Sequence, residues 1–219
     1  MSRFTQRHLD PGSRLGEILF GLIMVLTVTL TAGLTVTEGR AGVRHLLLAA
    51  IGSNVAWGII DAVMYIMNCM IVRRGKLRLV EAVQHASDPG SALFLVREGL
   101  EPELQELLPP EEAQAIGRSV VKHIAGAHIT KKILTKEDLY GAIACFWLVF
   151  VSCLPAALPF LIFSQPSLAL RISNFLSIAA LFYVGQKWAR YAGRNRLTVG
   201  LAMVAVGLAL VGVAILLGG

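Results

Sequence analysis

The sequence predicts an all-α integral membrane protein with five transmembrane helices and a small helical cytosolic insert between helices 2 and 3. Two observations predict this fold class. First, 55% of the 219 residues are hydrophobic and the mean hydropathy is +0.66, well beyond an ordinary soluble domain. Second, five apolar runs are each long enough to cross a hydrocarbon core of about 30 Å, which takes roughly 20 helical residues. These runs are 15–37, 46–71, 139–163, 168–187 and 197–218.

The first of these runs, 15–37, is expected to be a retained helix. Its apolar region is too long for a signal peptide, and no small-residue cleavage site follows it. With the N-terminus in the cytosol, the basic residues of the loops fall on the inner side, except Arg40, Arg44 and Arg171. This bias predicts a cytosolic N-terminus and a C-terminus outside. We expect a multi-pass protein of a bacterial inner (plasma) membrane.

Residues 73–138 form the predicted cytosolic helical domain, and residues 1–72 and 139–219 form the membrane part on either side of it. The stretch KLRLVEAVQHAS is expected to continue the second span and to stop near Asp88-Pro89-Gly90, since proline and glycine break helices. The segments SALFLVREGL and PELQELL follow. Pro109-Pro110 and the two glutamates after it are typical of a helix N-terminus, and this last helix runs through AQAIGRSVVKHIAGAHI.

Composition excludes several classes of function. The isoelectric point of about 9.5 is explained by bases that flank the spans, and residues 73–138 carry ten bases and ten acids, so we expect no nucleic-acid partner. The cysteines lie in or beside predicted spans and indicate no disulfide framework; they are Cys69, Cys145 and Cys153. No HExxH, nucleophile motif, P-loop or glycine-rich cofactor loop occurs. We therefore expect no enzyme and no covalently bound cofactor.

The second span carries a polar stripe within GSNVAWGIIDAVMYIMNCM. A step of seven residues returns to nearly the same helix face. Asn54, Asp61 and Asn68 therefore lie on one line, about 21 Å long at 1.5 Å per residue. An ionised aspartate at the bilayer centre costs about 2.5–3.5 kcal/mol on insertion scales, so it almost always faces protein or water. We interpret Asp61 as functional, whereas interhelical hydrogen bonding is the favoured role of the two asparagines.

The first span offers a matching line of residues. Glu17 lies at its cytosolic end, and Met24 follows one heptad later. The threonines near this face are interpreted as structural, because threonine hydroxyls in membrane helices usually bond to the backbone or to a neighbouring helix. The two spans together can line one polar pathway, and its candidate residues are Glu17, Met24, Asn54, Asp61 and Asn68.

The third span contains CLPAALPF, in which Pro155 and Pro159 are four residues apart. Proline in a membrane helix commonly marks a bend, so we expect both to be structural. This PxxxP segment and the tail from ALFYVGQKWAR to VAILLG resemble the vacuolar iron transporter family. The layout of EILFGLIMVLTVTLTAG and GSNVAWGIIDAV is also similar to the first helix pair of that family. The resemblance covers nearly the whole chain through short motifs.

The resemblance implies a homodimer whose first two helices line a central translocation path and exchange a divalent metal, Fe²⁺ or Mn²⁺, for protons. The acids are placed differently here. The family's first-helix Asp corresponds to Met24 and its second-helix Glu to Asn54, while Glu17 is retained, and the mid-depth carboxylate is Asp61. Two Asp61 carboxylates across a two-fold axis, with Asn54 and Met24, offer ligands for such a cation. They could also share a proton.

The family's cytosolic domain collects metal through glutamates at helical spacing. The corresponding glutamates here are spaced by three residues within two pairs, which places each pair on one helix face; they are Glu98, Glu101, Glu103 and Glu106. A solvated charged face is the alternative interpretation. His85, His123 and His128 are interpreted as surface or packing residues, because no HxxxH or CxxC pattern accompanies them.

The leading hypothesis is a dimeric, proton-coupled transporter of divalent metal. Glu17 stands at its cytosolic mouth, Asp61 is the central ligand or proton carrier, and the four glutamates of the insert capture metal. The expected partners are the lipid bilayer, a second copy of the chain, the cation and the proton. The alternative is a non-transporting membrane protein whose cytosolic domain binds a partner.

Overall fold

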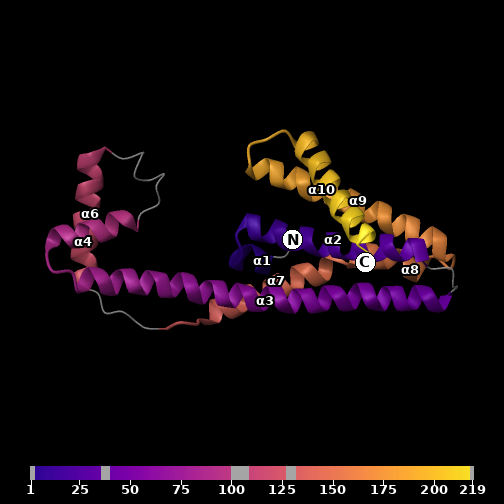
Figure 1. Ribbon diagram of the computed structural model, residues 1–219, viewed down its shortest axis with the longest axis horizontal. Coiled ribbons are helices and arrows are strands. Elements are labelled where there is room, and N and C mark those ends of the chain that lie inside the picture. Colours follow the sequence, from indigo (N-terminus) through magenta and orange to yellow (C-terminus); the bar gives the residue numbers. More distant parts are fainter. Residues whose placement is uncertain (1–2, 36–39, 100–108, 127–131, 218–219) are drawn as a thin grey trace. The chain divides into compact units, whose positions relative to one another are not determined.

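Every regular element in the described part of the chain is a helix, which confirms the all-α class. The computed structural model describes residues 3–35, 40–99, 109–126 and 132–217 (Figure 1). The chain divides into two compact units. The first unit comprises Met1–Ile66 and Lys136–Gly219, and the second comprises Met67–Thr135.

The first unit holds the membrane-spanning helices. Five helical stretches in the described ranges are long and apolar enough to cross a membrane, as the sequence predicted. They are formed by α2 (Pro11–Thr35), α3 (Arg40–Gln84), α7 (Lys136–Ser152) with α8 (Leu154–Ile162), α9 (Pro166–Tyr191) and α10 (Arg196–Leu216). A short helix that the sequence analysis did not foresee, α1 (Arg3–His8), precedes them and contacts α7.

The third span is broken into α7 and α8, where the sequence predicted a bend. Pro155 has no N–H to donate, and its ring excludes the carbonyl four residues earlier, so α7 cannot continue through it. Local side chains take up carbonyls at the break: the Ser152 hydroxyl donates to the carbonyl of Val149 (2.6 Å) and the Cys153 thiol to that of Phe150 (3.0 Å). Pro159 lies inside α8 and is buried. Pro155 thus accounts for the break, and Pro159 lies within the helix that follows it.

The core of the first unit lies where α2 packs against α9 and α10. Leu22, Leu26 and Leu181 are almost fully buried there, and other apolar residues surround them. The helices α9 and α10 approach closely at Gly185 and Gly200, where a Cβ on Gly185 would lie 2.8 Å from the Cα of Gly200. Small residues are the usual means by which membrane helices come this close.

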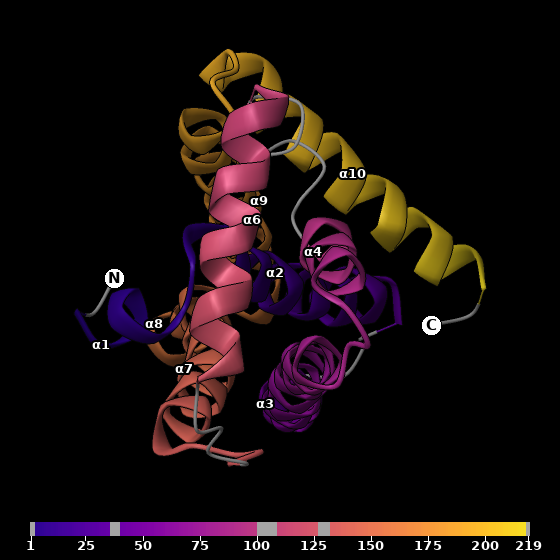
Figure 2. The same cartoon turned by 90° about the vertical axis from the view of Figure 1, so that its left-hand side faces the viewer.

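The second unit consists of the end of α3 with α4 (Pro89–Glu98) and α6 (Pro110–Ala125), and α4 and α6 contact each other (Figure 2). Val83, Ala92 and Val96 form its small core with residues of α6 around them. The predicted extension of the second span, the stop before Asp88 and the start at Pro110 are all confirmed. The expected segment PELQELL lies outside the described residues, as does the end of the last predicted helix.

Candidate functional site

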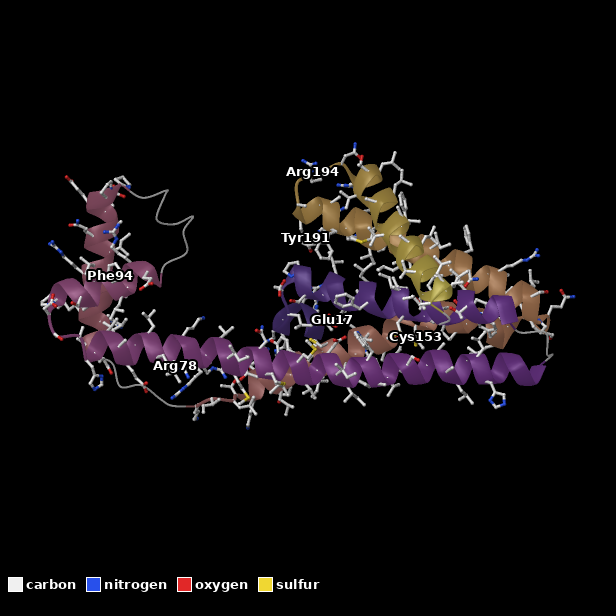
Figure 3. All side chains as sticks on the ribbon, viewed as in Figure 1. Glu17, Arg78, Phe94, Cys153, Tyr191 and Arg194 are labelled. Carbon is white, nitrogen blue, oxygen red and sulfur yellow. The ribbon has the colours of Figure 1, made fainter. Side chains whose placement is uncertain are left out.

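Two carboxyl groups meet between the first two membrane helices. Glu17 of α2 and Asp61 of α3 hydrogen-bond to each other through their side chains, and the thiol of Cys145 on α7 hydrogen-bonds to Glu17. Figure 3 shows Glu17 between α2 and α3. The second oxygens of the two groups, Glu17 Oε2 and Asp61 Oδ2, are buried and have no hydrogen-bond partner among the described residues. Each carboxyl group therefore retains one oxygen that is free to bind a ligand.

Asn54 extends this polar cluster by two helical turns along α3. It is fully buried, and its Nδ2 donates to the carbonyl of Ala50 at 3.1 Å. Its Oδ1 is buried and has no partner in the part of the chain that the structure describes. A buried amide oxygen without a hydrogen bond is costly. Asn54 Oδ1 is thus a third oxygen that can accept a hydrogen bond or bind a cation.

Glycines allow α2, α3 and α7 to approach each other around this cluster. Gly21 lies one turn after Glu17, and a Cβ on it would lie 2.8 Å from the carbonyl oxygen of Val149 and 3.1 Å from Asn54 Oδ1. Gly58 lies one turn after Asn54, and a Cβ on it would lie 3.1 Å from the ring of Phe146 on α7. At Gly21 the neighbours are the Ser152 hydroxyl, the Val149 carbonyl and the Asn54 amide, so no large side chain separates α2 from α7 at this point.

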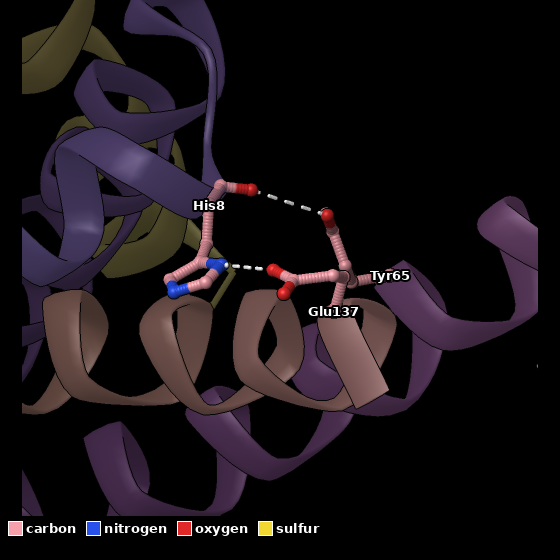
Figure 4. Close-up of polar contacts among 3 residues, drawn as sticks. All are labelled: His8, Tyr65 and Glu137. Carbon is pink, nitrogen blue, oxygen red and sulfur yellow. Dashed lines mark hydrogen bonds and ion pairs between the residues drawn. The ribbon is translucent and has the colours of Figure 1, made fainter. Parts of the chain in front are cut away.

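One end of the cluster is closed by contacts from α1 and α7. Tyr65, one turn after Asp61, lies against Gly141, and its hydroxyl donates to the carbonyl of His8 at 3.3 Å. His8 Nδ1 lies 2.9 Å from Glu137 Oε2 (Figure 4). The His8 ring also contacts the rings of Phe4 and Tyr140. These contacts fix the N-terminal helix α1 onto the beginning of α7.

The structure brings together three of the five pathway residues predicted from the sequence. Glu17, Asp61 and Asn54 lie together between α2, α3 and α7, and these three residues are called the seam below. Met24 lies on α2 one heptad after Glu17 and is half-buried. Asn68 is exposed and belongs to the second unit, so it is not part of this seam. Within the chain Asp61 pairs with Glu17, and a pairing of Asp61 with its counterpart in a second copy stays a prediction.

The metal ligands predicted in the insert are only partly described. Glu98 is exposed at the end of α4, and Glu101, Glu103 and Glu106 lie outside the described residues. In the described ranges, no group of three or more His, Cys, Asp and Glu side chains is arranged to hold a metal ion. A cation bound at the carboxyl pair therefore needs further ligands, such as an amide oxygen, water or groups of a second copy.

Sequence reasoning missed Cys145 and the contacts of His8, Tyr65 and Glu137. A signal for Cys145 exists on α7, where Gly141, Cys145 and Ser152 are small residues spaced by four and seven positions. Such a stripe favours close helix packing, although it does not identify the neighbouring helix. No comparable signal marks His8.

Comparison with known protein families gives a match to a family model described as the VIT family, over residues 79–219. The matched part begins near the end of α3 and includes α4, α6 and α7 to α10, and therefore Cys145. Residues 1–78, with Glu17, Asn54 and Asp61, precede it. No curated protein matches the chain. The family match does not include Glu17, Asn54 and Asp61. Their candidate role therefore rests on their geometry in the structure.

Proposed function

The chain belongs to the VIT family, a family of membrane proteins that transport metal ions, and from this premise we propose that it transports divalent metal of the iron and manganese kind in exchange for protons. In this proposal the carboxyl groups of Glu17 and Asp61 form the central binding site. The pathway runs between helices α2 and α3, at the axis of a homodimer.

The observation that carries this proposal is the carboxyl pair itself. A hydrogen bond between two carboxyl groups needs a proton on one of them, and two adjacent carboxylates rarely stay ionised together without a cation. A divalent cation that binds to both groups removes the need for that proton. Arrival of metal and release of a proton are then linked at the same oxygens, which is the requirement for an exchanger.

The other groups of the seam suit the proposed substrates. Divalent iron and manganese accept oxygen ligands, and iron also accepts softer sulfur ligands. Asn54 supplies an unpaired amide oxygen, and Cys145 supplies a thiol beside Glu17. The thiol favours Fe²⁺ over Ca²⁺, because Ca²⁺ binds oxygen ligands.

The proposed homodimer is supported by the large apolar surface that α3 leaves uncovered. In the most apolar 18-residue stretch of α3, only 6% of the residues are buried within the chain. The exposed residues of this helix include Trp57, Ile60 and Met64. A second copy on this side of α3 adds a second carboxyl pair to the pathway. The four glutamates predicted as metal ligands of the insert, Glu98, Glu101, Glu103 and Glu106, then serve to collect metal on the cytosolic side.

The test is transport by the purified chain in proteoliposomes with a metal-sensitive dye and a pH-sensitive dye. We expect Fe²⁺ or Mn²⁺ to enter with proton counterflow, and we expect Glu17→Gln and Asp61→Asn each to reduce both fluxes at least tenfold. The matched control is Glu112→Gln, an exposed glutamate of α6, which should keep both fluxes.

A metal-dependent thermal shift across Fe²⁺, Mn²⁺, Co²⁺, Ni²⁺ and Zn²⁺ ranks the substrates, because only binding to the folded chain stabilises it. Absence of flux and of stabilisation by every metal, with the folded chain intact, would refute the proposal. That outcome would favour the non-transporting alternative, in which the insert binds a partner.

A further inference from the structure

A cavity of about 850 Å³ lies in the first unit and is lined by residues of α1, α2, α7, α8 and α9, with Glu17, Asn54 and Asp61 not among the lining residues. Its volume is within the range of sites for small organic ligands, about 300–1,000 Å³. The beginning of α2 and the end of α9 form its outer part. Figure 3 labels Tyr191 at this end of α9.

The charged groups that line the cavity are all cationic. Arg14 of α2 and Lys187 and Arg190 of α9 line it, and the described lining residues include no aspartate or glutamate. Arg14 is only 8% exposed. Its Nε donates to the carbonyl of Asp10 at 3.3 Å, and its guanidinium forms no ion pair with another described residue. A buried guanidinium without a carboxylate calls for an anion.

The polar and apolar walls of the cavity are separated along the helices. Its lining extends from Pro11 to Leu22 on α2 and from Tyr191 back to Ala180 on α9, about 16 Å at 1.5 Å per residue. The cationic groups lie toward the ends of these helices, and apolar residues lie further into the span, among them Leu22 and Val184. This order matches a molecule with an anionic head and an apolar tail.

Aromatic residues also line the cavity, and one of them, Tyr191, lies at its cationic end. Tyr183, Tyr191 and Trp147 line the cavity, and Lys187 Nζ lies 5.0 Å from the centre of the Tyr183 ring. Tyrosine and tryptophan gather at the level of lipid headgroups in membrane proteins. Basic pockets between membrane helices bind anionic lipid headgroups, and arginine is well suited to bidentate contact with phosphate.

We propose that this cavity is a binding site for an anionic phospholipid. The phosphate lies between Arg14, Lys187 and Arg190, and one acyl chain extends along Leu22 and Val184. A free divalent cation is repelled from this site by the three positive groups, which separates it from the proposed transport pathway. The proposal also does not depend on transport, since it concerns different residues and a ligand of opposite charge.

The test is native mass spectrometry of the full-length chain with phosphatidylglycerol and with phosphatidylcholine of the same acyl chains. We expect bound phosphatidylglycerol at least tenfold in excess of phosphatidylcholine. The double variant Lys187→Gln/Arg190→Gln and the variant Arg14→Gln should each reduce that preference at least fivefold. Arg196→Gln is the matched control, because Arg196 is an exposed base at the start of α10 that does not line the cavity.

Three outcomes would overturn the proposal. The first is equal retention of the two lipids, and the second is an equal loss of preference in Arg196→Gln. The third is displacement of phosphatidylglycerol by inorganic phosphate alone, which would show a site for the free anion. The substitution of buried Arg14 can disturb folding. The lipid preference of the double variant Lys187→Gln/Arg190→Gln is therefore the deciding measurement, provided that its melting temperature equals that of the parent chain.

Discussion

At the scale of single residues, the absence of a side chain at Gly21 allows the residues of the seam to lie together. Glu17, Asn54 and Asp61 can share one seam because Gly21 places no side chain between α2, α3 and α7. Any side chain there meets the hydroxyl of Ser152, the carbonyl of Val149 and the amide of Asn54. The constraint is steric, since nothing about the backbone at Gly21 requires glycine.

We therefore expect Gly21→Leu to separate the three helices and destabilise the fold by about 1–3 kcal/mol, the usual cost of overpacking. The measurement is thermal unfolding of the purified chain in detergent, together with metal flux. Gly16→Leu is the control on the same helix, because a Cβ at Gly16 meets nothing within 4 Å. Equal melting temperatures for the two variants would contradict the steric explanation.

At the scale of helices, local chemistry determines where each element begins. The break before α8 follows from Pro155, and the beginning of α4 follows from Asp88. The Asp88 carboxylate accepts hydrogen bonds from the N–H groups of Gly90 (2.8 Å) and Ser91 (3.0 Å) and from the Ser91 hydroxyl (2.6 Å). These bonds, the Ser91 hydroxyl first, lower the pKa of Asp88 below its ordinary value of 3.8.

A lowered pKa in the folded state has a definite consequence for pH dependence. The capped form is favoured above the unfolded pKa, and its contribution is lost as the pH falls through the lower folded value. We expect the α4 amides of the parent chain to lose protection from hydrogen exchange below about pH 4, after correction for intrinsic exchange rates. Asp88→Ala should reduce protection at every pH.

Asp88→Asn distinguishes the two contributions, because asparagine caps a helix without ionising. Its α4 amides should be protected at neutral pH and should lack the acid transition. An acid transition that persists in Asp88→Asn would assign it to another group.

At the scale of the whole molecule, the two units have separate cores. Val96 is buried in the core of the second unit with Val83 and Ala92. Burial of an unpaired carboxylate costs several kcal/mol, so we expect Val96→Asp to unfold this unit. Hydrogen exchange should accelerate across residues 67–135 and remain unchanged in α2 and α9. Phe94→Asp on the same helix is the control, since Phe94 is 66% exposed.

Much of this architecture could be predicted from the sequence, because a membrane span is specified by the length and polarity of one segment. The five spans, the helical insert, the end of α3 before Asp88 and the helix start at Pro110 follow from such local rules. The pairing of Glu17 with Asp61 was only partly predictable. Periodicity places each residue on a face of its own helix, but it does not say which helices are neighbours, so Cys145 and the contact of His8 with Glu137 could not be found.

The contact between Gly185 and Gly200 has a consequence for how the bundle can deform. Because the two backbones approach closely here and neighbouring side chains pack around the contact, we expect α9 and α10 to move as one pair. By contrast, the span of α3 is covered by its own chain over only a small part of its surface. We therefore expect a rearrangement within the first unit to displace the span of α3 relative to the α9–α10 pair.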